Sequence, residues 1–95
     1  MDDFFTPPPF KPAEALVQLK RSLRETRPLA ERGEGFDFQG QRVIELALDG
    51  AVLSAKLAKR PARSPDWETR ALTTAAQVRQ FVDEVKRRVE RWGDE

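Results

Sequence analysis

The side chains that could do chemistry are few, because this 95-residue chain has no histidine and no cysteine. Histidine is the residue whose ordinary pKa suits a base near neutral pH. Cysteine supplies the thiolate that acts as nucleophile or metal ligand. A Ser-His-Asp triad and its cysteine variants are therefore excluded. Carboxylates, hydroxyls, amines and guanidinium groups remain.

Two pairs of residues could still be catalytic. Ser54 and Lys56 are expected on one strand face, where a lysine could activate a serine. Asp66 and Glu68 are likewise expected on one face, as a pair of carboxylates for acid–base work. Activation of the serine also needs a desolvated pocket and an oxyanion hole. Arg70 follows the two carboxylates on the same face, which favours a surface charge ladder, so we predict no enzyme.

No metal site and no cofactor are predicted. The carboxylates lack the spacing of a calcium-binding loop. The glycine-rich segment Gly33-Glu34-Gly35, followed by Gly40, precedes an expected strand and opens no helix. A dinucleotide-binding motif needs the opposite order.

Apolar spacing predicts two helices. The first covers about 12–26 and ends before Pro28, which disfavours helical geometry at the preceding residue. The second begins with a capping box in which Thr74 is the N-cap and Gln77 reaches back. Gly93 is expected to close this helix.

The charged residues of the second helix are expected on its solvent face. Glu84 and Arg88 are four residues apart, a spacing that supports an ion pair along a helix surface. Arg88 is therefore predicted to be exposed.

The middle of the chain predicts a β-hairpin. Asp49-Gly50 is typical of a two-residue turn between two apolar-rich runs. Leu48 should then lie opposite Ala51, with further pairs along both strands. One face carries the large apolar residues Ile44, Leu46, Leu48, Leu53 and Leu57. The other face carries Val43, Glu45, Ala47, Val52, Ser54 and Lys56.

Residues 67–72 are predicted to form a third strand. Two facings stay open, with the core side taken either by Trp67, Thr69 and Ala71 or by Glu68, Arg70 and Leu72. Phe36 and Phe38 either extend the first strand or form a short strand of their own, and residues 29–32 are expected to form a short turn. The predicted fold is therefore α+β in the order α-β-β-β-α. It has a three-stranded antiparallel sheet with two helices packed on one face.

The chain divides into a Pro/Phe-rich flexible tail over residues 1–11 and a single small α+β domain over residues 12–95. In the tail, Phe4, Phe5 and Phe10 flank a proline run, and Pro9 to Pro12 fits a PxxP pattern. Such a segment can be a ligand for an aromatic groove. The alternative is that the phenylalanines fold back onto the domain.

The open sheet face suggests a protein-binding surface, because Val43, Val52 and one facing of Trp67 would place apolar groups there. The strand over 67–72 also offers an edge for pairing with a second copy. We therefore predict a small non-enzymatic binding or accessory domain that acts through protein–protein contacts, with an unknown protein partner or self-association.

Nucleic-acid binding is the alternative. Lys56, Lys59, Arg60 and Arg63 surround one loop, with Trp67 nearby, and basic residues beside an aromatic ring can hold a single strand. The net charge of +1, from 17 basic and 16 acidic residues, provides no overall attraction to polyanions, so any such site must be local.

The order α-β-β-β-α resembles that of double-stranded-RNA-binding domains, although residues 74–79 lack that family's lysine-rich cluster. The layout of several strands before a long helix is similar to that of coactivator-type single-strand DNA binders. The residues that carry this second likeness are Phe38, Gly40, Arg42, Val43, Gly50, Leu72 and Thr73. Neither likeness includes a motif specific to its family, so no family is identified.

Localisation follows from two features. The acidic start of the chain lacks the basic and apolar regions of a signal peptide. No run approaches the ~18 apolar residues that a membrane span needs. We therefore expect a cytoplasmic protein without membrane contact.

Overall fold

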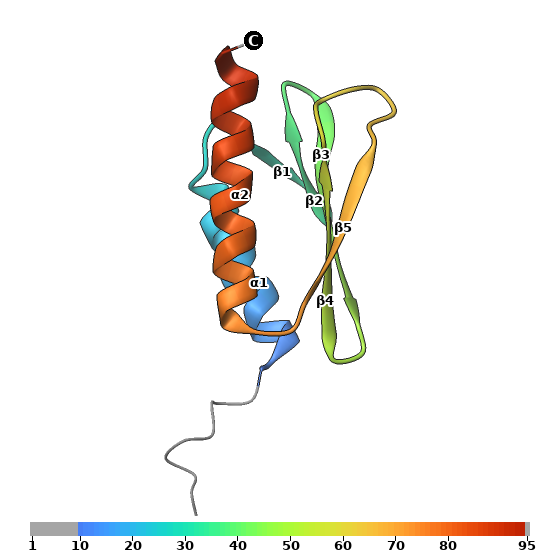
Figure 1. The fold of residues 1–95 in the computed structure, drawn as a ribbon, viewed down its shortest axis with the longest axis vertical. Coiled ribbons are helices and arrows are strands. Elements are labelled where there is room, and N and C mark those ends of the chain that lie inside the picture. Colours follow the sequence, from blue (N-terminus) through green and yellow to red (C-terminus); the bar gives the residue numbers. More distant parts are fainter. Residues whose placement is uncertain (1–9, 95) are drawn as a thin grey trace, which may run out of the picture.

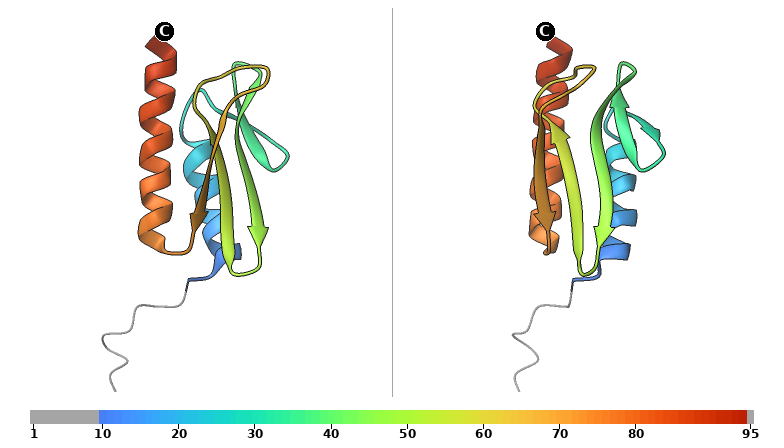
Figure 2. Two further views of the ribbon diagram at one scale, coloured as in Figure 1. Left: turned by 45° about the vertical axis from the view of Figure 1, so that its right-hand side comes forward. Right: turned by 90° about the vertical axis from the view of Figure 1, so that its right-hand side faces the viewer.

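The computed structural model describes residues 10–94. Its elements, in chain order, are α1 (Pro12–Arg24), β1 (Ala30–Arg32), β2 (Gly35–Phe38), β3 (Gln41–Asp49), β4 (Val52–Ala58), β5 (Trp67–Leu72) and α2 (Ala75–Asp94). The strands form one antiparallel sheet in the order β1-β2-β3-β4-β5. Both helices lie on the same side of this sheet, and its other face is open (Figures 1 and 2). The α+β class and the antiparallel sheet are therefore confirmed.

The predicted number of strands is wrong, because the sheet has five strands and not three. Phe36 and Phe38 form β2, a strand of their own, and residues 30–32 form β1 in place of the expected turn. The reversals around β2 depend on residues with positive φ: Gly33 at +60° before it, and Gln39 and Gly40 at +53° and +83° after it. Positive φ at both central residues is what a tight hairpin turn of type I′ requires.

The β3–β4 hairpin has the predicted faces but a shifted register. Leu48 lies opposite Leu53 and not Ala51, so the turn residues are Gly50 and Ala51. Gly50 has a φ of +62°, and glycine at the first central position is typical of a type II′ turn. The shift is two residues, and side chains alternate with period two. The side chains of the paired residues 44–49 and 52–57 therefore stay on their predicted faces.

The facing of β5 is resolved by its pairing with β4. Leu72 lies opposite the buried Leu53, and Glu68 lies opposite the buried Leu57. Cross-strand partners share a face, so Glu68 and its alternate neighbours lie on the side of the helices. Trp67 is consequently on the open face, opposite Ala58.

The core fills the space between the sheet and the two helices. Leu19 and Leu23 of α1 are fully buried. The ring of Trp92 on α2 packs edge-to-face against Phe38, with ring centroids 5.5 Å apart. The remaining buried residues of α2 are Phe81, Val82, Val85, Arg88 and Val89. Neither helix in the described part of the chain combines the length and the apolar character that a membrane span requires.

The N-cap of α2 is confirmed, because the Thr74 hydroxyl accepts a hydrogen bond from the Gln77 backbone N–H at 3.1 Å. The Gln77 side chain reaches back one residue further than predicted and accepts from the Thr73 N–H at 2.7 Å. Gly93 does not close the helix, which continues to Asp94. The first helix ends at Arg24, two residues before its predicted end.

A β-bulge in β3 removes Val43 from the open face. Phe36 lies opposite Ile44 while Asp37 lies opposite Arg42, so Val43 is the extra residue. It is fully buried, and its predicted place on a contact surface is wrong.

Position 35, in the strand paired with β3 at this bulge, has no room for a side chain larger than that of glycine. A Cβ there would lie 2.1 Å from the Ile44 carbonyl oxygen and 2.1 Å from Arg42 Nη1. The arginine could move, but the backbone carbonyl is held in the sheet. We expect Gly35→Ala to lower the free energy of unfolding by about 2 kcal/mol, the cost of an overpacked site. Urea denaturation measures this change.

Gly93→Ala is the matched control, because a Cβ there meets nothing within 4 Å. Alanine is the better helix former, so this variant should unfold at equal or slightly higher urea concentration. Equal losses of stability in the two variants would contradict the steric role of Gly35.

Candidate functional site

The open face of the sheet is the surface that the helices leave uncovered, and it faces the viewer in the right panel of Figure 2. Glu45, Lys56 and Thr69 form one cross-strand row on it, and Ala47, Ser54 and Ala71 form the next. These side chains are polar or small. The largest exposed apolar side chains of the described chain are Val17 and Leu48, which belong to α1 and to the helix side of β3. The open face therefore presents no broad apolar patch.

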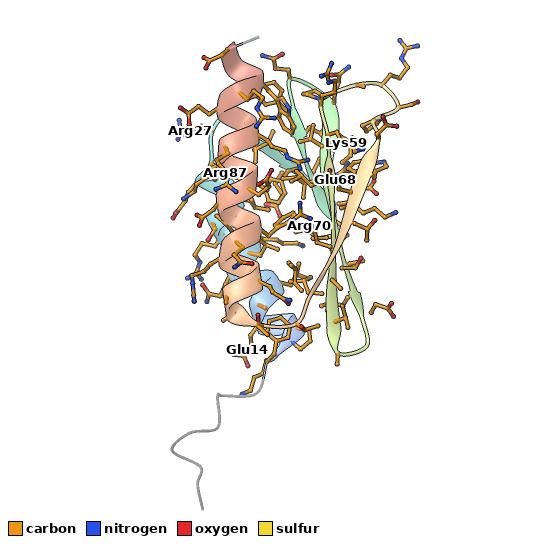
Figure 3. All side chains as sticks on the ribbon, in the orientation of Figure 1. Glu14, Arg27, Lys59, Glu68, Arg70 and Arg87 are labelled. Atoms are coloured by element: carbon orange, nitrogen blue, oxygen red, sulfur yellow. The ribbon has the colours of Figure 1, made fainter. Side chains whose placement is uncertain are left out.

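A basic cluster stands at the end of the sheet where β4 passes into the loop before β5. It consists of Lys56, Lys59, Arg60 and Arg63, all exposed. Lys56 lies on the open face, whereas Lys59 continues the alternation of Ala55 and Leu57 and so lies toward the helix side. Within residues 10–94 none of the four makes an ion pair or a side-chain hydrogen bond. The Lys59 backbone N–H donates to the Asp66 carbonyl at 2.9 Å, which holds the base of the loop closed. Lys59 is labelled at this end of the sheet in Figure 3.

Trp67 lies beside the basic cluster. Lys56 pairs across the strands with Thr69, two residues beyond Trp67 on the same face. Such diagonal neighbours have Cα atoms about 7–8 Å apart, within reach of long side chains. Trp67 is half-buried and packs against the core, so the residue is held by the core and is still partly exposed to solvent.

Other basic side chains are already paired with carboxylates. Arg24 contacts Glu31 at 2.6 Å, and Arg32 contacts Asp37 at 2.6 Å. Arg42 lies 3.5 Å from the same Asp37 carboxylate. The basic cluster differs from these residues because none of its four side chains makes an ion pair within residues 10–94, although the charge of Lys59, after Arg88 and Arg70, lowers the pKa of Glu68.

A hollow of about 360 Å³ adjoins the cluster on the open face. It is lined by Glu34, Arg42, Glu45, Leu46, Ala47, Ser54 and Lys56. Glu45 lies directly across from Lys56, although no ion pair joins them. The lining carries both signs of charge, so the hollow itself favours neither an anion nor a cation.

The two pairs of catalytic candidates show no direct contact within residues 10–94. Ser54 and Lys56 line the same hollow, but no hydrogen bond joins them in the described structure. Asp66 lies in the loop before β5, whereas Glu68 faces α2. Glu68 lies 3.5 Å from Arg70, as a charge ladder predicts. No group of three or more potential metal ligands occurs within residues 10–94.

Arg88 is buried, although helical spacing predicts it on the solvent face of α2. It is 8% exposed, and its guanidinium reaches between the helix and the sheet. Nε donates to Glu84 at 2.8 Å, Nη1 donates to the Ala58 carbonyl at 3.0 Å, and Nη2 donates to Glu68. Only the pair with Glu84 follows from helical spacing.

These contacts change the acidity of the two carboxylates. The hydrogen bond from Arg88 lowers the pKa of Glu68 below its ordinary value. The pKa of Glu84 is lowered by Arg87 first and by Arg88 second. Burial opposes the charge of Arg88, yet the bonds to Glu68 and Glu84 raise its pKa.

The tail residues are only partly described. Phe10 is half-buried and packs against the core, and Pro12 opens the first turn of α1. Phe4, Phe5 and Pro9 lie outside the described residues. Val52, the other apolar candidate of the open face, is half-buried.

No protein-family model, curated protein or solved structure matches this chain.

Replacement of Arg88 should strongly destabilise the fold. Arg88→Met leaves the Ala58 carbonyl and Glu68 without their donor, at a cost of about 2–4 kcal/mol. This loss of stability is at the low end of the range for buried ion pairs, because the Glu68 side chain is partly exposed to water. Arg87→Met is the control: its pair with Glu84 is exposed and contributes less than about 1 kcal/mol. Equal midpoints of thermal unfolding for the two variants would contradict the role of Arg88.

Stability should also fall in acid. Because the folded-state pKa of Glu68 lies below the unfolded value near 4.5, its contribution is complete above that pH and is lost as pH falls through the folded pKa. We expect the free energy of unfolding to decrease from about pH 5 to about pH 3, and to decrease less steeply in Glu68→Gln. Glu45→Gln, which removes a carboxylate of the open face that makes no ion pair within residues 10–94, is the control for the loss of one negative charge. Denaturant titrations across this pH range test both variants.

Proposed function

We propose that this chain binds single-stranded nucleic acid on the open sheet face. Phosphates contact Lys59, Arg60 and Arg63, and a base stacks on the exposed part of Trp67. The observation that carries the proposal is the position of basic side chains that make no ion pair within residues 10–94, beside a half-buried tryptophan. Lys56 adds a further charge within the sheet itself.

The basic cluster suits phosphate because its charges need not leave another partner. Arginine offers a planar fork of donors that matches two phosphate oxygens, and lysine offers a compact charge. A paired residue such as Arg32 would first have to break its contact with Asp37. Binding at the cluster therefore breaks no ion pair among residues 10–94.

Trp67 favours a single strand over a duplex. Bases in a duplex are stacked on one another, whereas a single strand can offer a base face to an aromatic ring. Stacking of this kind contributes roughly 1–3 kcal/mol per base and tolerates any sequence. The ring is already held against the core, so little conformational freedom is lost on binding.

A surface for an apolar protein partner has weaker support. Val43 is buried and Val52 is half-buried, so the predicted apolar patch on the open face is much reduced. A partner that pairs with the edge of the sheet is a separate possibility, since such contacts use the backbone and not an apolar patch.

Charge removal should weaken binding only at the cluster. The triple variant Lys59→Ala, Arg60→Ala and Arg63→Ala should bind a fluorescent oligonucleotide at least tenfold more weakly at low salt. Each lost phosphate contact also reduces the slope of log K against log salt by about 0.7. Fluorescence anisotropy across a salt series measures both quantities.

The control removes the same charge from the far side of the molecule. Arg79, Lys86 and Arg91 are exposed basic residues of α2, and their triple alanine variant should bind almost as well as the wild type. Equal weakening by both triple variants would mean that net charge alone drives binding, and would overturn the proposed site.

Substitutions of Trp67 test the contribution of base stacking to binding separately from the contribution of charge. Trp67→Leu should weaken binding of a single strand by about tenfold, while Trp67→Phe should retain most of it because a π-face remains. Binding of a duplex should change little in either variant. Circular dichroism verifies that both variants are folded, and equal affinities of the folded variants for the single strand would exclude a stacking role.

A further inference from the structure

The outer edge of β5 is unpaired in the described chain, because β5 pairs only with β4. Natural sheets usually protect such edges with very short strands, prolines or bulges. The opposite edge follows this rule: β1 has three residues, all exposed. Strand β5 has six residues, no proline within it and no bulge in its pairing. In the right panel of Figure 2, α2 lies behind β5 and no helix or strand is paired with the outer edge of β5.

The hydrogen bond at the base of the loop shows which backbone groups face outward. Lys59 donates to Asp66, and these two residues continue the β4–β5 register, so they form a hydrogen-bonded pair. Hydrogen-bonding direction alternates along an antiparallel strand. Glu68 and Arg70 therefore bond to β4. The residues with outward N–H and C=O groups are Trp67, Thr69 and Ala71.

We infer that β5 pairs antiparallel with β5 of a second copy of this chain, with Thr69 on the two-fold axis. The inference rests on the sheet edge and stands apart from the proposed nucleic-acid binding. The two sheets would join into one continuous sheet, and the interface would be isologous, as in most homodimers.

Charge selects this register among those that satisfy the outward groups. With Glu68 on the axis, two carboxylates would face each other, and with Arg70 on the axis, two guanidinium groups would. With Thr69 on the axis, Glu68 of each copy lies opposite Arg70 of the other. Opposite charges at cross-strand positions stabilise a sheet, and like charges destabilise it.

Glu68 is able to accept this additional contact. Its Oε1 binds Arg88 and lies 3.5 Å from Arg70 of the same chain. Its Oε2 has no hydrogen-bond donor within residues 10–94. The Arg70 side chain is 44% exposed and can reach across the axis.

In the same register, the side chains of the two copies that lie opposite each other on the open face are complementary in size. Trp67 of one copy lies opposite Ala71 of the other, which sets a large ring beside a small side chain. The two Trp67 residues would be four positions apart along the strands, or about 14 Å. The two basic clusters would then lie at opposite ends of one joined open face.

Site-specific crosslinking tests the register. The chain has no cysteine, so Thr69→Cys in the full chain provides a single thiol per copy. In the proposed register the two Cα atoms at position 69 are about 5.5 Å apart, within the range of a disulfide. Mild oxidation should convert most of the variant to a covalent dimer on a non-reducing gel.

Lys56→Cys is the matched control, because Lys56 lies on β4 in the same row as Thr69. Three strand spacings, about 14 Å, would separate the two thiols, which is too far for a disulfide. Equal crosslinking of the two variants, or none at position 69, would overturn the register.

Sedimentation velocity tests the dimer without a crosslink. The full-length protein should show a concentration-dependent shift from monomer to dimer. Arg70→Glu places carboxylates opposite each other and should weaken the dimer by at least tenfold, whereas Arg79→Glu changes the charge equally on the far side of α2 and should not. Thr69→Pro removes an outward N–H and should leave a folded monomer. A wild-type chain that is monomeric up to ~1 mM would overturn the inference.

Discussion

The buried guanidinium of Arg88 is the interaction on which the arrangement of the other parts depends. One side chain binds α2 through Glu84, β4 through the Ala58 carbonyl and β5 through Glu68. A buried charge is costly unless all its donors are satisfied, and here each guanidinium nitrogen has an acceptor. The contact with Glu68 holds that side of β5 against the helix. Trp67, the preceding residue, is thereby directed to the open face.

Charged side chains are paired with one another between the sheet and α2, whereas the basic side chains at the loop end of the sheet are not. On the helix side, Glu68, Glu84 and Arg88 satisfy one another, so their charges stabilise the fold and offer little to a ligand. At the loop end of the sheet, the basic side chains make no ion pair in the described structure. The net charge of +1 hides this contrast, because it averages paired and unpaired groups over the whole surface. A polyanion is attracted by a local excess of positive charge, even where the net charge of the whole molecule is small.

The spacing of apolar residues along the sequence determines which parts of the fold could be predicted. The faces of β3 and β4 and the Thr74 cap follow from local spacing, and apart from Val43 at the bulge they agree with the structure. The periodicity of the sequence could not reveal the two-residue error in the β3–β4 register, because a shift of two residues does not exchange the two faces of the hairpin. Strands β1 and β2 were missed or left open because one is wholly exposed and the other wholly buried, so neither shows alternation. The burial of Arg88 could not be predicted because two of its acceptors are 20 and 30 residues distant in the chain.

The open face and the free edge share the same residues, and this follows from strand geometry. Side-chain direction and hydrogen-bond direction both alternate with period two. In β5 the residues whose backbone groups point outward are therefore those whose side chains lie on the open face, including Trp67 and Thr69. Pairing at this edge would engage their backbone while leaving those side chains on the surface. A dimer would thus extend the candidate binding surface across both copies without covering it, and a bound strand could contact two tryptophans.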